Sequence, residues 1–259
     1  MAVKSEFNGW VQFRTPRNCP KCRLICFPFA GGGASQYATW KNMLGKDIEV
    51  VPVQLPGREN RINEAFVTDA EVLTKRLLGS IEPLLKDMPF FLFGHSMGGM
   101  LAYKFEQTVE ERMGLKAEKI FVSATSPEEE IAGAGISNLP EEEFIREVDR
   151  YGGLEEELWD YPEYLDLYIR ILRQDFKLIE SYGIDRNRRV KAPIHAYYGT
   201  EDKMVGNIQA RSWKKYTLAE FNMMEFTGGH FFMKEKKEEL CEDLKKRIEM
   251  QLRSFASEG

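Results

Sequence analysis

Hydrophobic and polar positions follow two alternating patterns along the chain. Short apolar runs predict buried strands at residues 23–29, 48–54, 89–93, 119–125, 193–199 and 221–226. Helical patterns lie between them, at residues 35–44, 69–86 (with Asp69 as N-cap), 96–112 and the charged run after Lys234. Strands that alternate with helices predict an α/β fold with a mostly parallel, doubly wound sheet covered on both faces.

One region breaks this alternation. Residues 127–190 contain no good strand, and their helical pattern is interrupted by turns at Gly152–Gly153 and Pro162. A helical insertion after one strand of a parallel sheet is typical of a lid over a site at the carboxyl ends of the strands. We therefore expect one domain over residues 1–259, with a lid insertion at about 127–190.

The predicted lid is strongly acidic. Residues 127–166 carry 14 acidic and 2 basic side chains, a balance of −12, which leaves +7 for the remainder of a chain whose net charge is −5. A solvated acidic helix surface is the simpler interpretation. The alternative is that this face repels acidic partners while the basic remainder receives them.

Composition narrows the class of protein. The chain has 259 residues, of which 43% are hydrophobic and 30% charged, and this profile is typical of a globular protein. The net charge of −5 argues against nucleic-acid binding. Since the sequence shows neither a secretory h-region nor an apolar run long enough to span a membrane, a cytoplasmic location is expected.

The cysteines give a weak signal. Cys19 and Cys22 form a CxxC pair, but no second pair lies at zinc-site spacing and no helix start follows. Free thiols are the favoured interpretation, and no metal is expected.

The stretch "GHSMG" suggests nucleophilic catalysis. It matches G-x-S-x-G between a predicted strand and a predicted helix, which is the context of a nucleophile elbow. Side chains at positions 94 and 98 would collide with neighbouring elements in so sharp a turn. Ser96 would lie at a helix N-terminus, which favours developing negative charge. A plain glycine turn is the alternative.

A serine nucleophile needs a base, and the chain has three histidines. His95 adjoins the elbow and is expected to pack behind the turn. His195 occupies an interior strand position and is expected to be a satisfied core histidine. His230 follows the last strand, where Gly228 and Gly229 allow the loop to bend over the sheet, so His230 is the predicted base.

The base in turn needs an orienting carboxylate. Glu201 and Asp202 lie just beyond the penultimate strand, and Asp202 is preferred. The order Ser96, Asp202, His230 is the order of α/β-hydrolases. The alternative for Asp202 is a turn residue or helix N-cap.

An oxyanion also needs hydrogen-bond donors. The N–H of Met97, directly after the nucleophile, is one candidate. The glycine-rich loop "PFAGGGAS" after the first strand supplies the other, for which Ala30 is nominated and Phe29 or Gly31 remain possible. A phosphate-binding loop is disfavoured because the lysine and spacing of such loops are missing.

Several stretches together resemble one family. "FPFAGGGAS", "LPGRENR", "FGHSMGG", "GTEDKMV" and "GGHFFM" are similar, in sequence and order, to the type II (external) thioesterases of non-ribosomal peptide and polyketide synthesis. The resemblance runs from about Arg23 to the end of the last helix. It implies an α/β-hydrolase fold in which the acidic insertion is the lid.

The resemblance also implies a reaction and a partner. These enzymes hydrolyse acyl groups from the phosphopantetheine thiol of acyl or peptidyl carrier proteins, which clears misprimed or stalled chains. No cofactor is implied, because the pantetheine arm belongs to the substrate. The carrier would be acidic and bind transiently, with residues 186–191 as a candidate contact or a solvated linker, and a monomer is expected.

Other functions remain possible at this stage. A carboxylesterase or lipase could use the same triad on oxygen esters, and a medium-chain acyl-carrier thioesterase of fatty acid synthesis is a relative of the same family. A non-catalytic binding module is disfavoured because all three triad residues are present.

Overall fold

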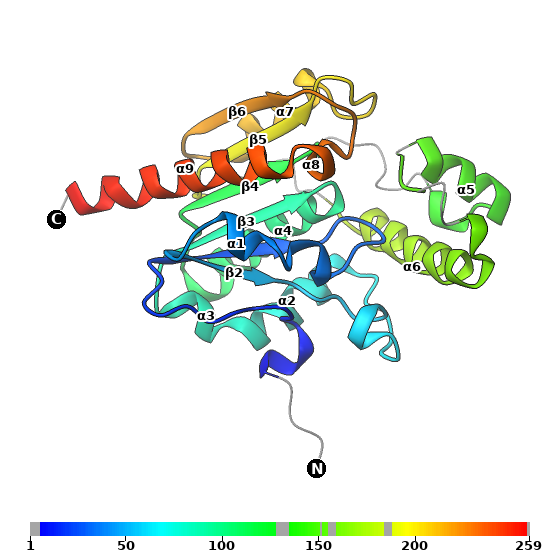
Figure 1. The fold of residues 1–259 in the computed structure, drawn as a ribbon, viewed down its shortest axis with the longest axis horizontal. Coiled ribbons are helices and arrows are strands. Elements are labelled where there is room, and N and C mark those ends of the chain that lie inside the picture. Colours follow the sequence, from blue (N-terminus) through cyan, green and yellow to red (C-terminus); the bar gives the residue numbers. More distant parts are fainter. Residues whose placement is uncertain (1–5, 128–134, 151, 155–158, 184–187, 258–259) are drawn as a thin grey trace, which may run out of the picture.

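The computed structural model describes residues 6–127, 135–150, 152–154, 159–183 and 188–257, and its centre is one six-stranded sheet (Figure 1). The strand order is β2-β1-β3-β4-β5-β6, and every neighbouring pair is parallel. The strands are β1 (Cys22–Phe27), β2 (Ile48–Pro52), β3 (Phe90–His95), β4 (Lys119–Ser123), β5 (Ile194–Gly199) and β6 (Phe221–Phe226). All six predicted strands and the parallel α/β class are confirmed, so the carboxyl ends of the strands meet at one edge of the sheet.

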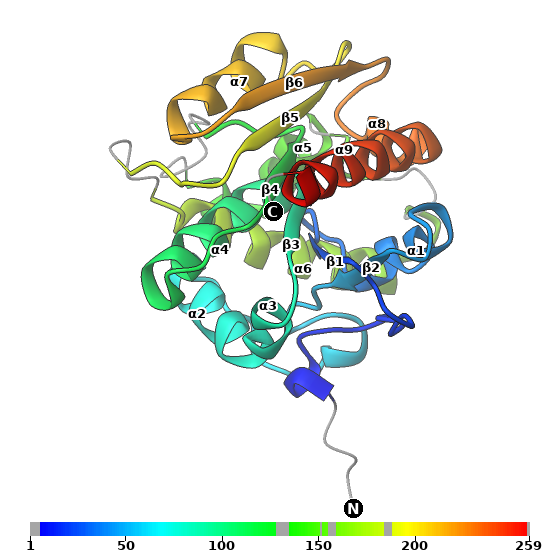
Figure 2. The same cartoon turned by 90° about the vertical axis from the view of Figure 1, so that its left-hand side faces the viewer.

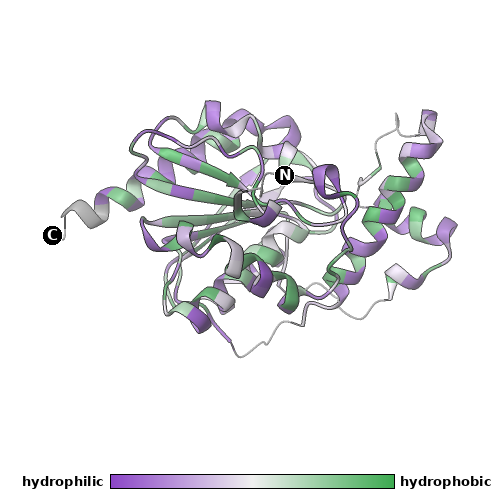
Figure 3. Ribbon diagram, turned by 90° about the horizontal axis from the view of Figure 1, so that it is seen from below, coloured by the Kyte–Doolittle hydropathy of each residue, from purple (hydrophilic) through white to green (hydrophobic). Residues whose placement is uncertain are grey.

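Hydrophobic residues run almost continuously along the strands, as expected for a parallel sheet covered on both faces (Figure 3). All residues of β1 to β5 are buried, whereas β6, at the edge of the sheet, is largely half-exposed. The buried parallel strands therefore place the loops that follow their carboxyl ends beside one another.

Helices form a layer on each face of the sheet (Figure 2). One core packs α2 and α4 against the sheet, and a second core packs α1, α8 and α9 against the other face. Among the described residues, no helix combines the length and apolar character needed to cross a bilayer. The α-helices are α1 (Trp40–Met43), α2 (Ala70–Ile81), α3 (Pro83–Lys86), α4 (Met97–Met113), α5 (Glu141–Arg150), α6 (Pro162–Glu180), α7 (Asn207–Ser212), α8 (Phe232–Glu235) and α9 (Lys237–Ser257). The short 3₁₀ elements are η1 (Glu6–Gly9), η2 (Ala34–Tyr37), η3 (Glu59–Arg61), η4 (Ile136–Asn138) and η6 (Trp213–Tyr216).

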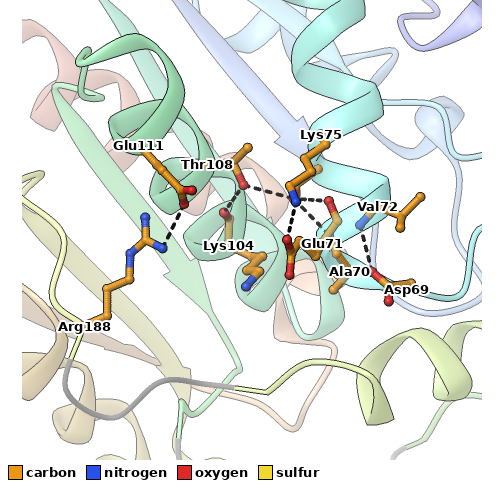
Figure 4. Close-up of polar contacts among 10 residues, drawn as sticks. Asp69, Ala70, Glu71, Val72, Lys75, Lys104, Thr108, Glu111 and Arg188 are labelled. Carbon is orange, nitrogen blue, oxygen red and sulfur yellow. Dashed lines mark hydrogen bonds and ion pairs between the residues drawn. The ribbon is translucent and has the colours of Figure 1, made fainter.

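Two predicted helices are discontinuous. The helix expected over residues 69–86 begins at its predicted cap, where Asp69 Oδ1 accepts the Val72 N–H at 2.8 Å (Figure 4). It ends at Ile81, and α3 starts at Pro83, because proline cannot donate the next helical hydrogen bond.

The helix expected over residues 35–44 is wrong as a single element and consists of η2 and α1. Tyr37 and Trp40 both pack inward on Phe93, with ring centroids 6.1 and 4.9 Å from its ring. Two inward-facing side chains three residues apart suit the tighter 3₁₀ turn.

The connection between β4 and β5 contains η4, α5 and α6 and extends beyond the carboxyl ends of the strands (Figure 1). Its helices have their own apolar contacts, in which Phe144 meets Phe176 edge-on at 5.5 Å. Parts of the predicted 127–190 insertion, at 128–134, 151, 155–158 and 184–187, lie outside the described residues. The described part is helical, as expected.

Candidate active site

Ser96 lies in the sharp turn between β3 and α4, as the glycine pattern predicts. Its backbone angles are φ 52° and ψ −123°, which is strained for a residue other than glycine. A Cβ on Gly94 would lie 1.9 Å from the carbonyl oxygen of Gly98, and one on Gly98 would lie 2.3 Å from that of Phe27. Both glycines are therefore required by close backbone approach, and the interpretation as a plain turn does not account for the strain at the serine.

The loops after three strands bring Ser96, His230 and Asp202 together. His230 Nε2 lies 3.0 Å from Ser96 Oγ, and His230 Nδ1 lies 2.8 Å from Asp202 Oδ2. The side chains of His230 and Asp202 are 8% and 0% exposed. With Asp202 ionised, Nδ1–H donates to the carboxylate and leaves Nε2 to accept the serine proton. The hydrogen-bond chain is thus arranged for proton transfer from the hydroxyl.

Asp202 fills both of the roles that its sequence position suggested. Its Oδ1 accepts the N–H groups of Met204 and Val205 at 2.9 and 3.1 Å, which closes a turn, while Oδ2 faces His230. Burial acts to raise the pKa of this carboxyl, but the hydrogen bond and charge of His230 and the two backbone donors outweigh burial and lower the pKa. The carboxylate that faces the base is therefore ionised at neutral pH.

The loop between β1 and η2 approaches the serine from the neighbouring strand. Ala30 and Met97 line the same cavity as Ser96 and His230. The N–H of Gly31 donates to Asp175 Oδ2 at 2.8 Å, so it is already occupied. Of the oxyanion donors considered in this loop, Ala30 is therefore favoured over Gly31, while Met97 lies in the first turn of α4, where helical N–H groups lack partners.

A narrow apolar cavity adjoins the serine. Its volume is about 30 Å³, and α6 supplies much of its wall. The wall residues contributed by α4 and α6 are Met97, Met100, Leu172, Phe176 and Ile179. An apolar group attached to a carbonyl at Ser96 could enter this cavity, which excludes charged groups by its lining.

The other two histidines lie in the core. His95 Nδ1 is 2.9 Å from Ser123 Oγ, and burial together with the charge of His230 lowers the pKa of His95 well below its usual range. For His195 the prediction of a satisfied core histidine is wrong in one respect, since neither ring nitrogen has a hydrogen-bond partner among the residues that the structure describes. Burial lowers its pKa to about 2, so it stays neutral among Phe121 and Tyr197.

The two cysteines of the CxxC pair lie in different environments. Cys19 is exposed, Cys22 is buried, and both are free thiols. In the portions of the chain that the structure describes, no three His, Cys, Asp or Glu side chains are grouped so that they could hold a metal ion.

Arg58 and Asp175 contact the loop of Ala30 but were not singled out from the sequence. Asp175 is a single carboxylate within an otherwise apolar face of α6, with Leu172, Phe176 and Ile179 around it. That interruption was the available signal, although the pattern alone does not show what an inward-facing carboxylate contacts.

A parallel sheet with a nucleophile elbow after β3 and the order Ser, Asp, His defines the α/β-hydrolase class. The family model described as "Thioesterase domain" matches residues 22–248. The chain belongs to this thioesterase family, and the resemblance predicted from its motifs is confirmed.

Individual relatives have similar lengths. Gramicidin S biosynthesis protein GrsT of Aneurinibacillus migulanus is 32% identical, over 97% of this chain and 98% of the relative. Thioesterase PikA5 of Streptomyces venezuelae is 28% identical, over 91% and 84%.

Solved structures agree with the sequence comparison. The type II thioesterase BorB from the borrelidin biosynthetic cluster aligns with a TM-score of 0.81 and 30% identity, covering 94% of this chain and 97% of BorB. RedJ, a thioesterase of prodiginine biosynthesis in Streptomyces coelicolor, aligns with a TM-score of 0.81 and 28% identity, covering 88% and 86%. The similarity to both relatives extends over nearly the whole chain.

Proposed function

We propose that this chain is a type II thioesterase that hydrolyses acyl groups from the phosphopantetheine thiol of carrier proteins in non-ribosomal peptide or polyketide synthesis. The observation that carries the proposal is the hydrogen-bonded series Ser96, His230 and Asp202 at 3.0 and 2.8 Å in a chain of the thioesterase family. The relatives named for gramicidin S and borrelidin biosynthesis support the class of pathway.

In the first half-reaction Ser96 Oγ attacks the thioester carbonyl while His230 Nε2 takes the hydroxyl proton. Asp202 keeps the imidazole in the required tautomer and stabilises its positive charge. The N–H groups of Met97 and Ala30 receive the oxyanion. The C–S bond then breaks, and the pantetheine thiol leaves with the proton from His230.

In the second half-reaction water cleaves the acyl-serine, with His230 as general base. A thiol is a good leaving group because its pKa is roughly 8.5, so the first half-reaction needs less acid assistance than amide cleavage. The apolar cavity beside α6 holds the acyl group, and the α5–α6 insertion acts as a lid over it. The proposed reaction uses no metal or organic cofactor.

The proposed partner is an acyl or peptidyl carrier protein that binds transiently to a monomer. Arg188, in the segment considered for docking, donates to Glu111 Oε2 at 3.1 Å (Figure 4). It also donates to the Gln107 carbonyl at 2.6 Å. This arginine is thus tied to α4, whereas Arg189 is exposed and available to an acidic carrier. Residues 186 and 187 of the same segment lie outside the described residues.

The test is deacylation of a carrier protein loaded with acetyl-phosphopantetheine, followed by intact mass. Wild type should deacylate the carrier rapidly, and Ser96→Ala should lower the rate by about 10⁶-fold because nucleophile and base act as a unit. Ser80→Ala on α2 is the matched control and should behave as wild type.

An oxygen ester of the same acyl group separates thioesterase from carboxylesterase activity. Fast cleavage of the ester beside an intact loaded carrier would contradict the proposal. Equal carrier deacylation by wild type and Ser96→Ala would contradict the role of the serine.

A further inference from the structure

A buried ion pair lies beside the triad. Arg58, in the loop after β2, and Asp175, on α6, are 4% and 1% exposed. Arg58 Nη1 donates to Asp175 Oδ2 at 2.6 Å and Nη2 donates to Oδ1 at 2.5 Å. This bidentate contact joins α6 to a loop 117 positions earlier in the chain.

The same two side chains hold the loop that follows β1. Asp175 Oδ2 accepts the Gly31 N–H at 2.8 Å, and Arg58 Nη1 donates to the Gly32 carbonyl at 3.1 Å. Because peptide groups are planar, the Asp175 contact orients the peptide that joins Ala30 to Gly31. The Ala30 N–H lies in the preceding peptide, whose Phe29 carbonyl accepts the Gly32 N–H at 2.9 Å. Both peptides that flank Ala30 are thus held through Gly31 and Gly32, the residues that Asp175 and Arg58 contact. The direction of the Ala30 N–H, the proposed oxyanion donor, therefore depends on this pair.

The helix that carries Asp175 also contacts the loop at a second point. Tyr168 lies two turns earlier on the same face, and a Cβ added to Gly31 would lie 2.6 Å from its hydroxyl oxygen. The cavity wall comes from the same helix through Leu172 and Phe176. The position of α6 therefore affects both the apolar cavity beside Ser96 and the loop after β1 that carries Ala30.

Stability explains this ion pair poorly. Desolvating two charges costs several kcal/mol per ion, and replacing a buried ion pair by apolar side chains is often neutral or stabilising. The hydrogen bonding is also incomplete, because the buried Nε of Arg58 finds no partner in the described part of the chain. An apolar pair could not form the hydrogen bonds that Asp175 and Arg58 make with the Gly31 N–H and the Gly32 carbonyl.

We propose that Asp175, held by Arg58, is a positioning residue that directs the Ala30 N–H toward the oxyanion. Through Asp175, the position of α6 then affects catalysis. The proposal rests on the proposed function, because it concerns the tetrahedral intermediate of the Ser96 reaction.

The first test compares Asp175→Asn with wild type on butyryl-N-acetylcysteamine. Oδ2 of Asp175 accepts from both Arg58 Nη1 and the Gly31 N–H, while Oδ1 accepts from Arg58 Nη2. An asparagine keeps only one acceptor oxygen and places an NH₂ donor against an N–H donor, so the bidentate contact that fixes Oδ2 is lost. We expect kcat to fall about 10²-fold, the effect of a small misplacement of a catalytic group, with KM little changed. The pH dependence of kcat/KM should keep the shape of the wild-type profile, since His230 and Asp202 are untouched.

The second readout is affinity for 1-butaneboronic acid, which forms a tetrahedral adduct with a serine nucleophile. If the oxyanion donor is misplaced, the inhibition constant should rise by about the same 10²-fold factor as kcat falls. Arg58→Gln should show the same pattern. The double variant should lose little more than either single variant, because both residues act through one contact.

A second buried ion pair provides the matched control. Arg23 Nε donates to Glu49 Oε2 at 2.7 Å with side chains 5% and 1% exposed, and both residues lie toward the amino ends of their strands, away from Ser96. Glu49→Gln should lower the unfolding temperature while leaving kcat and boronate affinity unchanged. If Asp175→Asn matches Glu49→Gln in both readouts, the ion pair is only structural and the proposal is overturned.

Two further measurements cover the cases in which Asp175→Asn does not fold or the proposed function fails. If Asp175→Asn does not fold, Arg58→Lys, which keeps the charge but loses the bidentate geometry, should still show the parallel loss of kcat and boronate affinity. Failure of wild type to deacylate a loaded carrier would overturn the proposed function alone. In that case the boronate affinities of wild type and Asp175→Asn still decide the role of the pair.

Discussion

At the scale of single residues, the site depends on backbone that few side chains tolerate. Ser96 adopts a positive φ of 52° between two glycines that leave no room for a Cβ. Such strain persists only where the surrounding structure holds it, here through the Ser96 N–H bonded to the Ser123 carbonyl at 2.8 Å and the Gly99 N–H bonded to the Ser96 carbonyl at 2.9 Å. The neighbouring strand and the first turn of α4 thus hold the hydroxyl in position.

Asp202 allows a prediction about pH. Its pKa is lowered in the folded state, so its contribution to stability is present above the unfolded pKa and is lost as the pH falls through the folded value. Asp202→Asn should therefore be less stable than wild type at neutral pH, and the difference should vanish on acidification. Urea unfolding at a series of pH values measures this, and a difference independent of pH would contradict it.

At the scale of elements, α6 performs two tasks with one face. The cavity is lined by Leu172, Phe176 and Ile179. Asp175 lies among them and accepts the Gly31 N–H in the loop after β1. An amphipathic helix normally buries its apolar face for stability alone. In the proposed reaction the buried face would also limit the acyl group, so its side-chain volumes should affect specificity.

Phe176→Leu tests the cavity wall. The smaller side chain should enlarge the cavity and shift the preferred acyl group toward longer chains, measured as kcat/KM for acetyl to octanoyl N-acetylcysteamine thioesters. The cost in stability should be about 1–2 kcal/mol, because the smaller side chain loses buried contacts and leaves a larger cavity. Phe105→Leu, on the buried face of α4 and outside the cavity, is the control. An equal shift of preference in both variants would contradict the role of Phe176.

At the scale of the whole molecule, charge is unevenly distributed along the chain. Residues 127–166 carry a balance of −12 against +7 for the rest. An acidic carrier should therefore be steered to the basic remainder and away from the α5–α6 insertion. Exposed charges act over about 10 Å at moderate salt, so this effect is sensitive to ionic strength.

Added salt should weaken the docking of the carrier without changing the chemical steps at Ser96. We expect kcat/KM for a loaded carrier to fall as sodium chloride increases, while the value for acetyl-N-acetylcysteamine stays nearly constant. Arg189→Glu should lower kcat/KM for the carrier alone, by about 10-fold or less because the charge is solvated. Equal salt dependence for both substrates would contradict electrostatic docking.

The sequence by itself determined the strands, the α/β class, the elbow and the order of the three candidate site residues. These are local properties, because apolar runs, a cap such as Asp69 and the glycines at 94 and 98 express requirements of neighbouring residues. The family resemblance was also visible in short motifs. Even the error at residues 35–44 was one of local helix type, decided by two aromatic rings that pack on the same neighbour.

Only the tertiary structure decided which groups meet across the fold. It disfavoured Gly31, one of the alternatives to Ala30 as oxyanion donor, by pairing its N–H with Asp175, 144 positions away. It also gave the two ring nitrogens of His195 no hydrogen-bond partner among the described residues. It also joined Arg58 to α6. Such contacts depend on how β1, the loop after β2 and a distant helix pack together, and no spacing along one segment encodes the distance between atoms of separate elements.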